Sequence, residues 1–96
     1  MTWTERLNRL EGRVALGGAG IEVLHWAYDP DLADNVPHRH AYHEVCLVGG
    51  WGAGRFTVEG EDHPIAPGDL FFARPGVVHQ IRNDQSRRME LSWVSF

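Results

Sequence analysis

Residues 37–44 read Pro-His-Arg-His-Ala-Tyr-His-Glu, and this stretch decides the fold prediction. His38 and His40 are two positions apart, so on a β-strand both imidazoles project from the same face. Glu44 has the same parity as His40 and joins that face if the strand contains no bulge. Two imidazoles and a carboxylate on one face are the beginning of a metal site, because the carboxylate adds a hard oxygen ligand and neutralises part of the charge of the ion.

A fourth candidate ligand, His79, must come from another strand. Three imidazoles and one carboxylate suit Zn, Fe, Mn, Ni or Cu, and on an octahedral ion they leave two positions open for a ligand or substrate. A lone histidine in a strand is more often solvated or hydrogen-bonded than bound to metal, and we interpret His25, His43 and His63 in that way. The same interpretation stays open for the His-x-His pair taken alone, because that spacing is common by chance.

The rest of the chain is typical of short strands separated by turns. Branched and aromatic residues predict strands over 21–28, 44–48, 54–58, 69–74, 77–82 and 90–96. Turns are predicted at the polar loop 59–62 and at the Pro-Gly pairs 67–68 and 75–76. A short helix over Glu5–Glu11, capped by Thr4 and stopped by Gly12, precedes them. Little helix and regular turns favour a closed or sandwiched antiparallel barrel.

Composition excludes several classes of protein. The 96 residues make one small domain, and no segment approaches the ~18 apolar residues of a membrane span. The net charge is −4 and all nine basic residues are scattered arginines, which argues against direct nucleic-acid binding. The single Cys46 cannot form an internal disulfide and the N-terminus lacks the apolar run of a secretory signal, so we expect a cytoplasmic protein.

Two motifs in register resemble those of the cupin superfamily. The first is the His-x-His run with its following Glu, and the second consists of Gly68, Gly76, His79 and Asn83. The resemblance covers about half of the chain and implies a double-stranded β-helix, a jelly-roll barrel with a divalent transition metal inside it. The four ligands that it carries over to this chain are His38, His40, Glu44 and His79.

The fold prediction is therefore an all-β cupin barrel with a short N-terminal helix. Residues 1–96 form a single domain. Its core spans 38–83, a helix and strands occupy 4–28, and a closing strand occupies 90–96.

A narrower resemblance is to the N-terminal sensor domain of AraC-type transcription regulators. It rests on the runs 37–40, 67–72 and 75–79, and above all on the closing Leu-Ser-Trp-Val-Ser-Phe of 91–96. In that family dimerising helices and two helix-turn-helix units follow the barrel, and neither occurs in these 96 residues. The resemblance implies a module that binds a small-molecule effector. From the scattered arginines we expect no direct contact with DNA, and exposed edge strands of the barrel could pair two chains as a homodimer.

The residues leave sensor, enzyme and structural roles open. A sensor would hold its effector among aromatic side chains, each of which could equally belong to the barrel core: Tyr42, Trp51, Phe56, Phe72 and Trp93. An enzyme of the dioxygenase, isomerase or lyase type would use the same four ligands. The sequence supplies no evident second acid or base, so we favour the sensor. A structural cupin without metal is the third interpretation.

Overall fold

The computed structural model describes residues 1–10 and 12–96. Its elements are α1 (Trp3–Asn8), β1 (Arg13–Leu16), β2 (Ala19–Glu22), β3 (His25–Asp29), β4 (Glu44–Val48), β5 (Gly54–Val58), β6 (Glu61–Ile65), β7 (Leu70–Ala73), β8 (His79–Asn83) and β9 (Leu91–Ser95). Strands β4 and β5 have the predicted bounds, and β7, β8 and β9 differ by one or two residues. The predicted strand 21–28 is instead divided between β2 and β3. The single helix in the described part of the chain is too short to cross a membrane.

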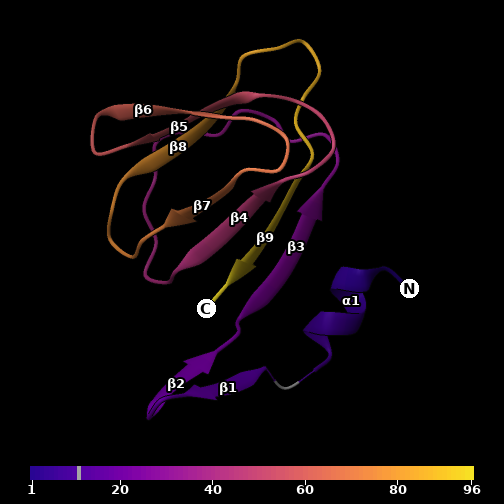
Figure 1. Ribbon diagram of the computed structural model, residues 1–96, viewed down its shortest axis with the longest axis vertical. Helices are drawn as coiled ribbons and strands as arrows, with labels where there is room; N and C mark the ends of the chain where they lie inside the picture. Colours follow the sequence, from indigo (N-terminus) through magenta and orange to yellow (C-terminus); the bar gives the residue numbers. More distant parts are fainter. Residues whose placement is uncertain (11) are drawn as a thin grey trace.

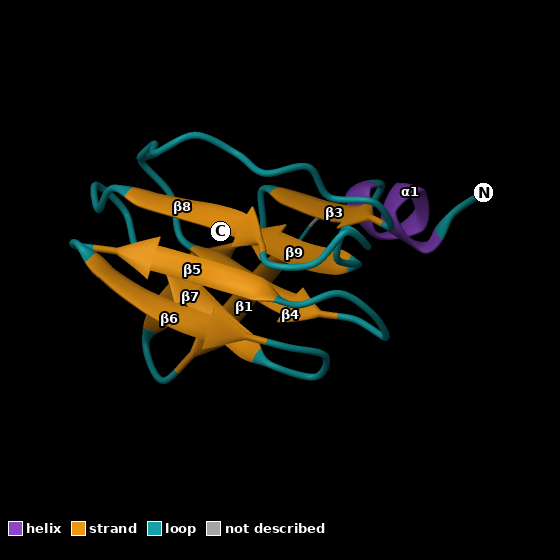
Figure 2. Cartoon of the chain, turned by 90° about the horizontal axis from the view of Figure 1, so that it is seen from above, coloured by secondary structure: helices purple, strands orange, loops and turns teal. Residues whose placement is uncertain are grey.

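The strands form a two-sheet barrel and a separate hairpin. A four-stranded sheet has the order β3-β9-β4-β7, a three-stranded sheet has the order β6-β5-β8, and all pairs are antiparallel. The two sheets face each other (Figures 1 and 2), whereas the β1–β2 hairpin extends beyond the barrel past the start of β3 (Figure 1). The predicted all-β barrel with a short N-terminal helix is confirmed.

The core lies between the two sheets and follows from strand alternation. In β4, Cys46 and Val48 are buried while Leu47 is exposed on the outer face. Phe71 of β7 meets Phe56 of the other sheet with ring centroids 4.6 Å apart, which joins the two layers. The buried cluster contains Cys46, Val48, Phe56, Ile65, Phe71, Ala73, Ile81, Met89 and Leu91.

The loop predicted at 59–62 is a two-residue turn. Glu59 and Gly60 both have positive φ, 50° and 79°, as a type I′ turn between antiparallel strands requires. Glu61 and Asp62 therefore belong to β6, where they pair with Val58 and Thr57. The prediction was wrong for these two residues because their polarity was taken as a sign of a loop, although they lie on an exposed edge strand.

The helix begins and ends earlier than predicted. Thr2 is the N-cap, since its hydroxyl accepts from the backbone N–H of Glu5 and the Glu5 carboxylate accepts from the N–H of Thr2. The predicted cap at Thr4 is therefore wrong, and the predicted end at Glu11 lies outside the described residues. The Asn8 side chain bonds both the N–H and the C=O of Trp26, so α1 covers that part of the edge of β3.

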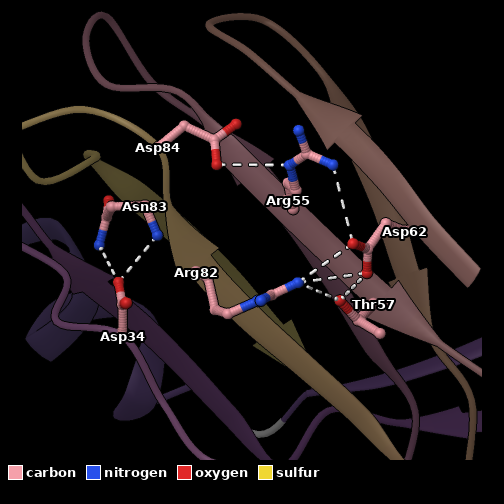
Figure 3. A network of polar contacts seen from close by, with 7 residues as sticks. All are labelled: Asp34, Arg55, Thr57, Asp62, Arg82, Asn83 and Asp84. Atoms are coloured by element: carbon pink, nitrogen blue, oxygen red, sulfur yellow. Dashed lines mark hydrogen bonds and ion pairs between the residues drawn. The ribbon is translucent and has the colours of Figure 1, made fainter. Parts of the chain in front are cut away.

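Polar contacts on the three-stranded sheet fix the far end of β8 (Figure 3). The Asn83 side chain donates to Leu32 O at 2.9 Å and to Asp34, and it accepts from the N–H of the fully buried Met89. Asp34 also accepts from the backbone N–H of Asn83. This residue of the second motif thus holds the segment after β3 against the barrel.

Candidate metal centre

His38 is positioned by a chain segment that runs beside β8. The backbone N–H of Asn35 donates to Ile81 O, and the Asn35 side chain accepts from the N–H of Ile81 at 2.7 Å. Three residues later His38 pairs with His79 through two backbone hydrogen bonds of 3.0 and 2.8 Å, in an isolated antiparallel bridge. Directly opposed residues of a bridge project to the same face, so the two imidazoles lie 4.4 Å apart by ring centroid.

The premise of a strand through His38 and His40 is wrong, although both reach the same site. Residues 39–43 form no strand, and the backbone carbonyl of His40 accepts instead from the N–H of Gly76. Its ring lies 4.8 Å from that of His79 and stacks on Tyr42 at 4.1 Å. One ring nitrogen from each of the three histidines lies within 4.8 Å of the others, a group that could hold a metal ion.

The three histidines share one hydrogen-bonding pattern that orients them. The Nδ1 atoms of His38, His40 and His79 lie 2.8, 2.8 and 2.9 Å from the backbone carbonyls of residues 36, 42 and 77. A carbonyl can only accept, so each Nδ1 carries a hydrogen and donates it. The neutral ring then presents its lone pair on Nε2, which is the arrangement of a metal-binding histidine whose other nitrogen is held by a backbone oxygen.

Burial favours the neutral, ligating form of His79. Desolvation lowers the pKa of this imidazole from its ordinary value of 6.5, and the neighbouring His38 and His40 lower it further. The bond to Val77 O and the nearby Glu44 act in the opposite direction with less effect. At neutral pH His79 is therefore an uncharged donor of a lone pair rather than a cation.

Glu44 faces His40 in a way that requires a cation. Its Oε1 lies 3.0 Å from Nε2 of His40, and its Oε2 accepts from the hydroxyl of Ser95 at 3.3 Å. Because Nδ1 of a neutral His40 holds the ring hydrogen, Nε2 and the carboxylate are two acceptors with no hydrogen between them. A proton on His40 satisfies the pair, and so does a metal ion that binds both atoms. The donor set of three imidazoles and one carboxylate therefore fits a divalent transition metal.

A small cavity adjoins the histidine cluster inside the barrel. It has a volume of about 130 Å³ and is lined by Asn35, His38, Glu44, Cys46, Ile81, Leu91 and Trp93. Burial raises the pKa of the Cys46 thiol to about 12, so this group stays protonated at neutral pH. Beside the candidate ligands, the described lining thus offers no free acid or base.

The predicted aromatic pocket is divided among different parts of the molecule. Trp93 lines the cavity, and Phe56 packs in the core beside His79 at 5.9 Å. Tyr42 lies on the solvent side of His40. The Trp51 indole donates to Pro30 O on the surface, under the guanidinium of Arg87. Phe72 is 58% exposed on the outer face of β7.

The alternation of side chains along a strand would have corrected the prediction of the aromatic pocket. Phe71 and Phe72 alternate, so when Phe71 enters the core Phe72 cannot line the interior. Cys46 has the same parity as Glu44 in β4, which could have placed it in the cavity. Asn35 gave no sequence signal, because its contacts with Ile81 span 46 positions.

The family follows from a match that covers most of the barrel. Residues 24–95 match the family model described as the cupin domain. The chain belongs to the cupin family. The match includes the three histidines and Glu44, so this cupin carries its histidine cluster within the matched region. No curated protein matches the sequence.

Solved structures of other cupins share the fold. A predicted oxalate decarboxylase from Thermotoga maritima is 27% identical with a TM-score of 0.67, over 77% of this chain and 66% of that one. An RmlC-like cupin from Shewanella frigidimarina is 22% identical with a TM-score of 0.62, over 88% and 83%. The DMSP lyase DddQ from Ruegeria pomeroyi is 25% identical with a TM-score of 0.54, over 73% and 34%. The chain therefore spans less than two thirds of the first and third of these proteins.

Proposed function

We propose that this cupin binds a divalent transition metal through His38, His40, His79 and Glu44, and that it acts as the effector-binding module of an AraC-type transcription regulator. The observation that carries the metal site is the shared pattern of the histidines, each with Nδ1 bonded to a backbone carbonyl and with one ring nitrogen within 4.8 Å of those of the other two. When bound, the metal supplies Lewis acidity and coordination positions for a small ligand. The protein residues hold those positions beside the 130 Å³ cavity.

The lining of the cavity supports binding more than acid–base chemistry. Asn35 and Trp93 offer polar and aromatic contact surfaces, while the Cys46 thiol is held protonated by burial. General acid–base catalysis needs a group that titrates near the working pH. A site without one beside its ligands is suited to the recognition of a small effector.

The end of the chain is linked directly to the candidate ligands, which also supports a sensor. Ser95 donates to Glu44, and Phe96 forms two backbone hydrogen bonds of 2.9 Å with His43. The Phe96 and His43 rings stack at 5.2 Å. A segment attached after residue 96 would leave the barrel beside Glu44, so an effector that moves Glu44 or Ser95 would change how that segment starts.

Metal analysis tests the ligand assignment. We expect a stoichiometric amount of transition metal, measured by mass spectrometry, in the wild type and in the control His63→Ala, whose side chain is exposed on β6. The variant His40→Ala should lose it after dialysis. An equal metal content in the wild type and in His40→Ala would contradict the assignment of the ligands.

Sequencing the gene beyond the codon for Phe96 tests the regulator. A continuation into two helix-turn-helix units supports an AraC-type protein, and an immediate stop codon contradicts it. This result is independent of the metal analysis, so the two parts of the proposal can fail separately.

A metal-dependent enzyme is the second candidate, and the activities ascribed to two structural neighbours favour it. The Thermotoga protein is described as a predicted oxalate decarboxylase and the Ruegeria protein as a DMSP lyase. The assay incubates the metal-loaded chain with oxalate and with DMSP. Turnover that is retained in His63→Ala and lost in His40→Ala supports the enzyme, and no turnover with either compound removes the support that these names give.

A further inference from the structure

The side chain of Asn35 is held in one orientation that leaves its amide nitrogen available. Its Oδ1 accepts from the backbone N–H of Ile81 at 2.7 Å, and because an N–H can only donate, the atom that faces Ile81 must be the amide oxygen. Gln80 fixes the backbone of the same residue by donating to Asn35 O at 2.9 Å. Within the described residues Nδ2, the remaining polar atom, makes no hydrogen bond. Asn35 lines the cavity beside the histidine cluster, so it can donate to a molecule there.

The lining of this cavity combines two kinds of side chain. Its polar groups come from Asn35, His38 and Glu44. The other lining residues are uncharged and buried or partly buried: Cys46, Ile81, Leu91 and Trp93. A ligand that fills the cavity therefore needs a head that accepts hydrogen bonds and a short apolar tail.

The charges around the cavity suit a head with a single negative charge. A divalent ion and the Glu44 carboxylate sum to one positive charge, because histidines bind metal in their neutral form. The described lining contains neither arginine nor lysine. A monoanion would neutralise the site, whereas a second negative charge would lose its water without gaining a cationic partner.

The volume of the cavity limits the length of the tail. A cavity of about 150 Å³ lined by apolar residues can hold benzene. The cavity described above measures about 130 Å³, so it has room for about six non-hydrogen atoms. A carboxylate with a tail of two or three carbon atoms is of this size, and a fatty acid or a sugar is too large.

We propose that the effector of this cupin is a short aliphatic monocarboxylate of about three or four carbon atoms, and that Asn35 recognises its carboxylate by donating from Nδ2. The proposal rests on the metal site proposed above, since without the ion Glu44 would repel the carboxylate. Asn35 is then a specificity residue, which separates an anionic acceptor from a neutral molecule of the same shape. A purely structural Asn35 would need only the contact of its oxygen with Ile81.

Calorimetric titration of the Zn²⁺-loaded full chain tests the ligand class. We expect butyrate to bind with a dissociation constant below about 1 mM. Butyramide has the same shape without the charge, octanoate has a tail too long for the cavity, and oxalate has two charges and no apolar tail. Each of these three should bind at least about 10-fold more weakly than butyrate. Metal analysis after each titration checks that the probe has not removed the ion.

Asn35→Asp tests the role of Asn35 with a change of almost no volume. The new side chain keeps an oxygen for the N–H of Ile81 but replaces Nδ2 by a charged acceptor. The dissociation constant for butyrate should rise roughly 10–100-fold, and the preference for butyrate over butyramide should fall by a similar factor. Metal content and melting temperature should stay close to those of the wild type. Gln85→Glu makes the same amide-to-acid change at an exposed position after β8 and should keep the wild-type affinity.

The outcomes separate this proposal from the metal site on which it rests. A chain that takes up no metal contradicts both. A metal-loaded chain that binds butyrate no better than butyramide, octanoate or oxalate overturns the ligand class and leaves the metal site intact. Butyrate binding that is as strong in chelator as with metal also overturns it. An unchanged affinity for butyrate in Asn35→Asp would show that Asn35 has only a structural role.

Discussion

The two ends of β8 carry opposite kinds of polar site. His79 begins the strand in a cluster where Nε2 of His40 and the Glu44 carboxylate face each other as acceptors. Asn83 ends it beside Asp34, which accepts from its backbone and side chain, and a second group on the same sheet surrounds Asp62 with donors from Thr57 and Arg82 (Figure 3). We call these two groups the matched network, in which each of the two carboxylates has its donors. Carboxylates matched with donors need no cation, although the buried Nε of Arg82 has no acceptor among the described residues, whereas converging acceptors do need a cation. A structural polar site therefore differs from a binding site in whether its acceptors already have hydrogen-bond donors, not in how polar it is.

Metal binding should give the largest effect on stability, and this effect should depend on the His79 end of β8 and not on the Asn83 end. At 100 to 1,000 times its dissociation constant, a metal that binds the folded chain stabilises it by about 2.7–4.1 kcal/mol. For a domain of this size the melting temperature should rise by roughly 10 °C or more. Scanning calorimetry with Zn²⁺, Mn²⁺ or Ni²⁺ against a chelator measures the shift.

Variants at the two ends control this experiment. His40→Ala should abolish the shift, and Asp62→Asn in the matched network should preserve it. A shift of equal size in His40→Ala would mean that the metal binds elsewhere on the chain.

Replacement of Asn83 should give the next largest effect, now on stability alone. Asn83→Ala removes the bond to Leu32 O and leaves the N–H of the buried Met89 without an acceptor. We expect a loss of about 2–3 kcal/mol from the free energy of unfolding in urea. Gln85→Ala, an exposed neighbour, is the control. A metal-induced shift that disappeared in Asn83→Ala would contradict the separation of the two ends.

The sequence predicted the histidine cluster because its members recur at motif spacing, but the argument from strand parity was wrong. His38 and His40 lie in a loop, and hydrogen bonds from residues 35 and 38 to β8 bring them to His79. Such contacts span more than 40 positions and leave no local pattern. The family motifs therefore indicated which histidines come together, but not the hydrogen bonds that bring them together.

The bounds of the barrel strands were predictable from turns, whereas the break between β2 and β3 was not. Alternation and Pro-Gly turns gave β4, β5, β7, β8 and β9 to within two residues. The break between β2 and β3 falls at Val23 and Leu24, two apolar residues that carry no turn signal. It is produced where the chain leaves its hairpin and joins β9, since Leu24 donates to Ser95 O.

Glu44→Gln should change metal affinity and metal-free stability in opposite directions. The amide nitrogen of Gln can donate to Nε2 of a neutral His40, which replaces the facing acceptors by a hydrogen bond worth about 1 kcal/mol. The metal loses its charged oxygen ligand, so its affinity should fall by at least the roughly 10–100-fold that loss of an outer partner costs. Urea unfolding in chelator above neutral pH and metal titration measure the two effects. Lower stability of the metal-free variant would contradict the assignment of the ring hydrogen to Nδ1.

Asp62→Asn should give the smallest effect, because its pairs with Arg55 and Arg82 are solvent-exposed and exposed ion pairs contribute little. The Thr57 hydroxyl, followed by the two arginines, lowers the pKa of Asp62 from its ordinary value of 3.8. A carboxylate with a lowered folded-state pKa stabilises the fold above the unfolded value, and this contribution is lost as the pH falls through the folded value. The small difference in urea midpoint between wild type and variant should therefore close on acidification. It should also close in about 1 M NaCl, where the screening length is about 3 Å. A difference that persisted under both conditions would show that Asp62 acts through packing, and the matched network would then owe its stability to shape rather than to charge.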